Sequence, residues 1–144
     1  MSSEDELREK LRKIEALFAG AKTPGERDAA GAAAERIRAR LAEVEAREAP
    51  VEMRFSIQDR WSRQLFVALC RRYGLEPYRY QRMKQQTLVV RAPRSFVEGI
   101  LWPEFDQLNQ ALVAHLTSVT ERVIRDVVHV DTREARERVD QNDP

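Results

Sequence analysis

The stretch PYRYQRMKQQTLVVR, residues 77–91, combines arginines, a lysine, two tyrosines and three glutamines and contains no acidic residue. Cations neutralise phosphates, tyrosine rings stack on unpaired bases, and glutamines hydrogen-bond to base edges or phosphates. Residues 51–94 as a whole hold ten Lys and Arg against three Asp and Glu, a net charge of +7. The preceding segment carries −1 and the following one −5. This asymmetry predicts a surface that binds a polyanion, or one that meets the acidic end of its own chain or of a second copy.

The candidate binding residues come from a helix expected over residues 57–73 and a hairpin that follows it. On that helix, arginines would lie opposite an inward stripe of Trp61, Leu65, Ala68 and Leu69. In the first strand of the hairpin, the two tyrosines would share a face with Arg82. The predicted nucleic-acid-binding residues are Arg60, Arg63, Arg71, Tyr78, Arg79, Tyr80, Arg82, Lys84, Arg91 and Arg94. An alternative is that the tyrosines close the core and the arginines form a solvated face.

Residue types that perform catalysis are sparse and widely separated. His115 and His129 would lie about 21 Å apart along one helix, too far to share a metal ion. Cys70, the single cysteine, has no histidine nearby in the sequence, and we expect a small buried thiol. The chain has no phosphate-binding loop and no dinucleotide-binding glycine pattern. The sequence therefore predicts no enzyme, no metal site and no cofactor.

The composition predicts one helix-rich globular chain. Hydrophobic residues make up 42% of the 144 residues and charged residues 34%. No apolar run is long enough to span a bilayer, and the charged start MSSEDELREK lacks the apolar core of a secretion signal. We expect a cytoplasmic location.

Hydrophobic spacing predicts a first part, residues 1–49, that is an antiparallel helical hairpin. One helix is expected over residues 4–20 and a second, rich in alanine, from residue 23 to about residue 47. Pro50 would stop the second helix, and the alternation of Val51, Met53 and Phe55 allows a short strand. A short connection between two such helices favours antiparallel packing.

The second predicted part, residues 50–130, contains the basic helix, a β-hairpin and a long last helix. The hairpin strands would be LEPYRYQ and QTLVVRA, and Pro103 would kink or break the helix that starts near residue 95. Residues 131–144 would form a charged, flexible tail. The predicted fold class is mainly α with a small β-hairpin (α+β), in the order α-β-β-α after the helical hairpin.

An apolar stripe runs along the predicted last helix for about seven turns. From Phe105 to Val130 its members step by 3, 4, 4, 3, 4, 4 and 3 residues, close to a coiled-coil seam. Packing within the chain would explain this stripe, and so would self-association. The predicted oligomer interface is Leu108, Leu112, Leu116, Val119, Val123 and Val127.

Residues 7–43, LREKLRKIEALFAGAKTPGERDAAGAAAERIRARLAE, resemble the bacterial and phage domain-of-unknown-function family numbered 2786. The matching features include Leu11, Ile14, Leu17 and the alanines of the second helix. The stretch from Trp61 to Pro93 looks like the helix and hairpin that often accompany that domain. The second helix is longer here and ends in charged residues. The resemblance implies a phage or mobile-element context and supplies no activity.

Two functions follow from these patterns. The first is a non-enzymatic, oligomeric nucleic-acid-binding protein of a regulatory kind that uses the basic helix and hairpin surface. The second is a protein-interaction or scaffold module that uses the long helix and the basic face. No small-molecule substrate and no membrane partner is indicated.

Overall fold

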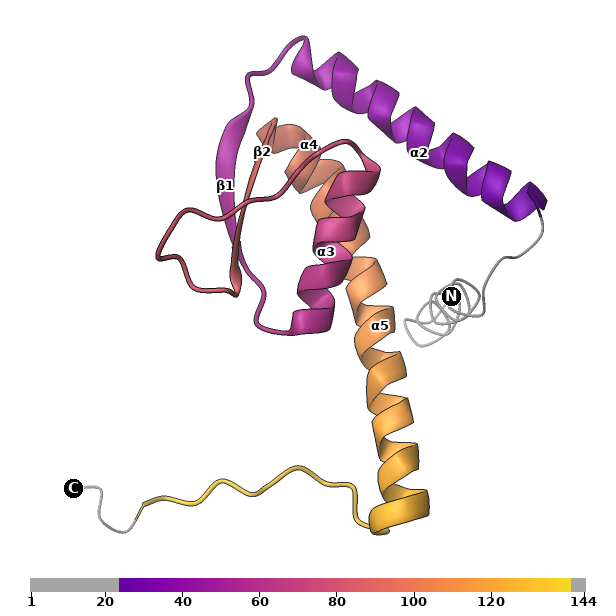
Figure 1. Ribbon diagram of the computed structural model, residues 1–144, viewed down its shortest axis with the longest axis vertical. Coiled ribbons are helices and arrows are strands. Elements are labelled where there is room, and N and C mark those ends of the chain that lie inside the picture. The colour runs from indigo at the N-terminus through magenta and orange to yellow at the C-terminus, as the bar shows by residue number, and fades with distance from the viewer. Residues whose placement is uncertain (1–23, 141–144) are drawn as a thin grey trace.

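The computed structural model describes the backbone of residues 24–140 and the side chains of residues 31–140. Its elements before the last helix are α2 (Pro24–Glu45), β1 (Val51–Ser56), α3 (Arg60–Arg72) and β2 (Thr87–Ala92). The predicted mainly helical α+β class is confirmed, with one two-stranded sheet and a long C-terminal helix. Figure 1 shows α3 and the long helix on the same side of the sheet, with α2 crossing above them. The predicted helix over residues 4–20, and with it the helical hairpin, lies outside the described residues.

The sheet pairs β1 with β2 in antiparallel register, with Met53 opposite Val90 and Phe55 opposite Leu88. These residues share the inner face of the sheet, where Leu88 and Val90 are buried in the core. The short strand at residues 51–55 that the sequence allowed is thus the main partner of β2. The order after α2 is β-α-β-α, and the predicted α-β-β-α order is wrong.

The prediction of a hairpin between residues 75–81 and β2 is also wrong, because these two segments do not form a two-stranded ladder. Only Tyr78 reaches β2, through one bridge to Val89. Pro77 has no amide hydrogen to donate, and the chain leaves the sheet at a turn in which Met83 donates to the carbonyl of Tyr80. Residues 75–81 therefore flank β2 without forming a strand.

Helix α3 starts later than predicted, because Asp59 caps it by accepting a hydrogen bond from the amide of Trp61 at 3.2 Å. Its inward face consists of Ser62, Phe66, Leu69 and Cys70. Trp61, predicted to face inward, is 57% exposed. Ala68, which was also predicted to face inward, is exposed. At both Trp61 and Ala68, the buried side of the helix is therefore rotated by about one residue from the predicted stripe.

The long helix runs without interruption from Arg94 to Val128, and the predicted break at Pro103 is wrong. The turn before Pro103 is a π-turn, in which the amide of Trp102 donates to the carbonyl of Val97. A proline ring crowds the carbonyl four residues earlier, so a widened turn directly before it lets the helix continue. The segments are α4 (Arg94–Phe96), η1 (Val97–Leu101), α5 (Trp102–Val123) and η2 (Ile124–Val128).

The core is an aromatic and aliphatic cluster between the sheet and the two helices behind it. Phe66 of α3 is fully buried, and its ring centroid lies 5.0 Å from Phe55 and 5.1 Å from Phe105. Apolar side chains from β2 and from the start of the long helix complete the cluster. Burial of such side chains supplies most of the stabilisation of a small domain.

Helix α2 joins this core through Ala34 and Leu41, which are 4% exposed. The turn that follows α2 is tied to the long helix by Glu48, which accepts hydrogen bonds from the amide and the hydroxyl of Ser95. These hydrogen bonds lower the pKa of Glu48. Ile37 and Val44 are half-buried on the same side of α2 as Leu41, at helical spacing.

The apolar stripe of the long helix divides into two halves. Leu112 is buried and Leu108 packs against the core, whereas Val119, Val123 and Val127 are 38%, 52% and 79% exposed. Figure 1 shows this second half extending beyond the sheet and α3. Packing within the described residues therefore covers the first half of the stripe and leaves the second half open.

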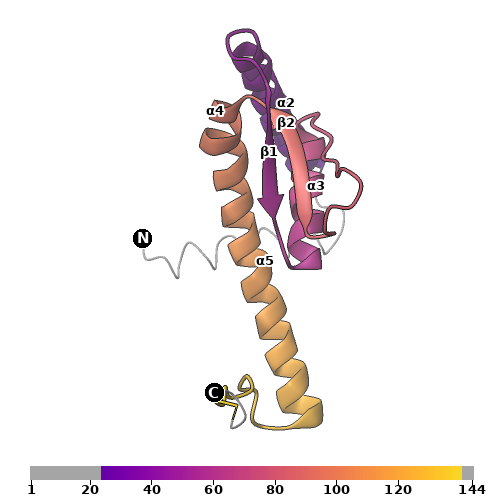
Figure 2. The same ribbon diagram turned by 90° about the vertical axis from the view of Figure 1, so that its left-hand side faces the viewer.

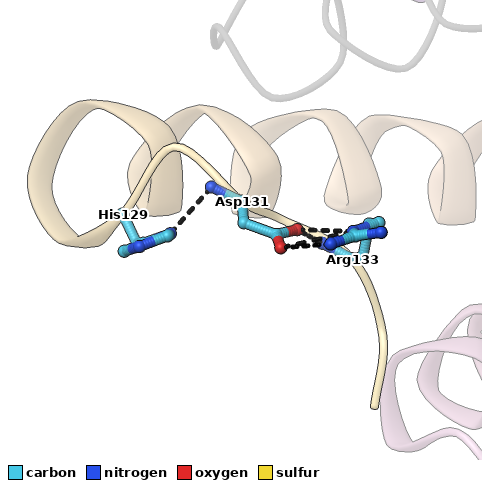
Figure 3. Close-up of polar contacts among 3 residues, drawn as sticks. All are labelled: His129, Asp131 and Arg133. Carbon is cyan, nitrogen blue, oxygen red and sulfur yellow. Dashed lines mark hydrogen bonds and ion pairs between the residues drawn. The ribbon is translucent and has the colours of Figure 1, made fainter. Parts of the chain in front are cut away.

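The chain leaves the long helix through a local hydrogen-bonded turn. The amide of Asp131 donates to Nδ1 of His129 at 2.9 Å, and the Arg133 guanidinium pairs with both oxygens of Asp131 (Figure 3). The Arg133 guanidinium also lowers the pKa of Asp131. Residues 131–140 form no regular secondary structure.

Replacing Arg82 with glycine is expected to raise the free energy of unfolding by up to about 1 kcal/mol, because Arg82 has a φ of 70°. Side chains disfavour this left-handed region, and glycine does not. Arg82→Val, with a branched Cβ, is expected to lower the free energy of unfolding by about 1 kcal/mol or more. Urea denaturation of both variants measures these changes. A Gly variant less stable than the Val variant would contradict the turn geometry.

Candidate nucleic-acid interface

Four of the predicted binding arginines line one open groove of about 390 Å³ between α3 and the loop at residues 79–85. Arg60, Arg63 and Arg71 come from α3, and Arg79 comes from the loop. The remaining lining residues are Gln64, Val67, Ala68 and Gln85. We call this site the arginine groove. None of its lining residues is acidic, so it concentrates positive charge beside two amide side chains.

Spacing on α3 explains why three arginines meet here. Arg60 and Arg63 are three residues apart, and Arg71 lies two further turns along the same exposed side, opposite the buried Phe66 face. Val67 is half-buried and Ala68 is exposed, and both side chains are short, so they form the bottom of the groove between the arginines. The sequence prediction that these arginines share one side of the helix is confirmed.

Three of the four arginines are held in place by contacts within the chain. One nitrogen of Arg63 donates to the carbonyl of Ile57 at 2.9 Å, and Arg79 donates twice to the carbonyl of Gln85. Arg71 forms a two-pronged ion pair with Glu76, which lowers the pKa of that carboxyl group. Such contacts fix each guanidinium while leaving some of its five N–H donors for a ligand.

Arg60 differs from the other three arginines. Its side chain is exposed and forms no hydrogen bond or ion pair with any residue in the described part of the chain. It is the groove cation whose removal disturbs the fold least. The ion pair of Arg71 with Glu76 is exposed at the rim of the groove. It contributes little to the stability of the fold, because water and salt screen ion pairs at the surface.

The two tyrosines form a separate cluster on the outer face of the sheet. Both hydroxyls donate to Oε1 of Glu52 on β1, and the rings meet edge to face with centroids 5.6 Å apart. Tyr80 is 48% exposed. Arg91 lies opposite Glu52 across the sheet. The predicted shared face of Tyr78 and Tyr80 is confirmed, and neither tyrosine closes the core.

The arginine groove and the tyrosine pair therefore lie on opposite sides of residues 78–80. Tyr78 and Tyr80 point to Glu52, whereas Arg79 between them points to Gln85 and α3. Side chains alternate along an extended segment, so this split is geometrically required. The predicted binding residues are therefore divided between two faces.

The other predicted cations lie outside the groove. Arg82 and Lys84 are exposed on the two successive turns of residues 80–87, and Arg91 is on the outer sheet face. Arg94 lies near Glu98 at the start of the long helix, with 3.5 Å between charged atoms. The arginine groove thus contains four of the ten predicted binding residues.

Lowering the pH is expected to weaken the stabilisation that Glu52 provides. The hydrogen bonds that it accepts from Tyr78 and then Tyr80 lower its pKa below the usual range of a glutamate. A carboxylate whose pKa is lower in the folded state stabilises the fold above its unfolded pKa and loses that effect as the pH falls. The stability difference between the native chain and Glu52→Gln should therefore shrink between pH 7 and pH 3. Urea denaturation across this range tests it, and an unchanged difference would contradict it.

Cys70 is completely buried, as predicted, and burial raises its pKa to about 12. At neutral pH a thiol with this pKa is protonated and does not act as a nucleophile.

Residues 24–140 contain no helix with the length and apolarity needed to cross a bilayer.

No family model, curated protein or solved structure matches this chain. The resemblance of residues 7–43 to the family numbered 2786 therefore stays a prediction. The function of the arginine groove is therefore inferred from the geometry and charge of its lining residues.

Three residues that shape these surfaces were not among the ten predicted binding residues. Gln64 and Gln85 line the arginine groove, and Glu52 holds the tyrosines. Gln64 follows Arg60 by four residues, so helical spacing places both on one side. Nothing local marks Glu52, because its contact with Tyr78 spans 26 residues.

Proposed function

We propose that this chain binds nucleic acid through the arginine groove and has no catalytic activity. The observation that carries the proposal is the convergence of four arginines and two glutamines, without an acidic lining residue, in one hollow. Guanidinium groups pair with phosphate oxygens through two parallel hydrogen bonds, and amides add neutral contacts. A groove that tracks a backbone in this way binds with little sequence preference.

The chemistry of the lining favours binding over catalysis. General acid–base catalysis needs a group that gains and loses a proton near neutral pH. Arginine stays charged and glutamine does not titrate, so the lining supplies charge and hydrogen bonds only. The exposed Tyr80 ring, on the far side of residues 78–80, offers a second contact for a strand that wraps around this segment.

Salt-dependent binding to single- and double-stranded DNA and RNA tests this function. Release of counterions from about four phosphates predicts that affinity falls about 50- to 150-fold between 50 and 200 mM salt. Fluorescence anisotropy with labelled oligonucleotides measures this fall. Absence of binding at 50 mM salt would refute the proposal, and equal binding to polyglutamate would indicate an acidic protein surface as the target.

A protein-interaction module is the second candidate function, and the open half of the long helix favours it. Val119, Val123 and Val127 continue the spacing of the buried residues into solvent. A partner helix, from a second copy or another protein, would cover them by coiled-coil packing. Light scattering of the native chain and of Val123→Glu tests self-association there, and a monomeric native chain would refute it.

A further inference from the structure

The outer edge of β1 carries unpaired backbone groups. Val89 exchanges hydrogen bonds of 3.0 and 2.8 Å with Tyr78, so its backbone points away from β1. By alternation, β2 bonds to β1 at Val51, Met53 and Phe55, and the bond from Ile57 to Gln86 continues this series. The amides and carbonyls of the intervening residues 52, 54 and 56 therefore point to the opposite edge. No other described residue pairs with them there.

An open hollow lies along this edge. Its lining includes four consecutive strand residues, Glu52 to Phe55, although their side chains alternate between the two faces. A hollow that touches all four must follow the edge of the strand. The start of the long helix forms the other wall, through Val97, Trp102 and the ion pair of Arg94 with Glu98. Figure 2 shows β1 with β2 on one flank only.

Apolar surface at this edge is also incompletely covered. The Trp102 ring stacks on Phe55 with centroids 5.3 Å apart, yet Trp102 is 38% exposed. An unpaired strand beside an exposed tryptophan has the features of a site that accepts one more strand.

We propose that β1 pairs with β1 of a second copy, antiparallel and centred on Met53. Two-fold symmetry then joins the two sheets into one. With this centre, Glu52 of each copy faces Arg54 of the other copy, so the interface contains two such pairs. Residues 52 and 54 are the ones whose backbone groups point to the free edge, so they form the hydrogen-bonded pairs. A centre at residue 52 would oppose two glutamates, and one at residue 54 would oppose two arginines. Only the register centred on Met53 pairs opposite charges.

This dimer is independent of nucleic-acid binding and of the open half of the long helix. Its interface uses the edge of β1 and the exposed part of Trp102. Oxygen Oε1 of Glu52 accepts both tyrosine hydroxyls, which leaves Oε2 for the facing arginine. The tyrosine pair thus orients the carboxylate that the second copy meets.

Charge exchange tests the register. Sedimentation equilibrium is expected to give twice the chain mass of 16.7 kDa for the native protein. Arg54→Glu alone, or Glu52→Arg alone, places like charges opposite each other twice and should raise the dimer dissociation constant roughly tenfold or more. An equal mixture of the two variants restores both opposite-charge pairs and should dimerise like the native chain. Circular dichroism confirms that each variant is folded.

A cysteine pair provides a second test that leaves Glu52 and Arg54 intact. In the proposed register the Cα atoms of the two Met53 residues are about 4.5 Å apart, which suits a disulfide. Met53→Cys should therefore crosslink under mild oxidation, whereas Val51→Cys, two residues from the symmetry centre along the strand, should not. The native Cys70 is buried and does not compete.

Three outcomes would overturn the proposal. One is a native chain that stays monomeric while neither cysteine variant crosslinks, which would leave an extended segment of another protein as the candidate occupant. Another is equal crosslinking of the two cysteine variants. The third is a dimer that survives Arg54→Glu and dissociates in Val123→Glu.

Discussion

Phe66→Ala is expected to lower the free energy of unfolding by about 3–5 kcal/mol. The Phe66 ring is fully buried and contacts aromatic rings from three other places in the chain, Phe55, Trp102 and Phe105. Alanine removes the ring and leaves a cavity that the sheet and the long helix cannot close without moving apart. The total stability of a small domain is about 5–15 kcal/mol, so this single change consumes a large share of it.

Urea denaturation followed by circular dichroism measures this loss. Val113→Ala, on the 41% exposed surface of the long helix, is the matched control and should change stability by about 0.5 kcal/mol or less. A similar slope of stability against urea in both variants would show that they unfold from comparable folded states. A loss below 1 kcal/mol for Phe66→Ala would mean that the ring is not at the centre of the core.

Arg60→Glu is expected to weaken nucleic-acid binding at 50 mM salt by about tenfold or more, because it replaces one phosphate contact with repulsion. Arg60→Gln, which only neutralises the charge, should reduce the slope of log affinity against log salt by about 1. Since Arg60 has no partner among the described residues, both variants should keep native stability.

The matched control for Arg60 is Arg40→Glu on α2. Arg40 is also exposed, and it does not line the arginine groove. Both substitutions change the net charge equally, so a general electrostatic effect would weaken binding to the same extent in both. Equal losses would contradict a specific role for the groove, and a loss confined to Arg60→Glu would support it.

The sequence predicted what depends on helical spacing. Spacing placed the arginines of α3 on one exposed side of that helix, and it placed Phe105, Leu108 and Leu112 of the long helix on the side that packs within the chain. Burial of Cys70 followed from its position among apolar residues. These predictions succeed because a helix fixes which residues share a face through local geometry alone.

Strand pairing could not be predicted in this way. The partner of β2 is β1, more than thirty residues earlier, and α3 lies between them. A turn after residues 75–81 favoured a hairpin between these residues and β2, because hairpin patterns are read from neighbouring residues. Pairing between strands that are distant in the sequence leaves no such local pattern. Likewise, the π-turn that accommodates Pro103 has no signature in residue type, and the Glu52 contact with both tyrosines depends on the pairing that was missed.

The long helix also has a consequence for local opening. Its amides from Val97 to Leu112 can exchange with deuterium only when the sheet and α3 come apart, so their protection should approach that of global unfolding. The amides beyond Val119 lie on turns that no described element covers, and they can open by fraying from the C-terminal end. A single unbroken helix should therefore show a steep gradient of exchange rates. A partner seated on its open half would flatten that gradient.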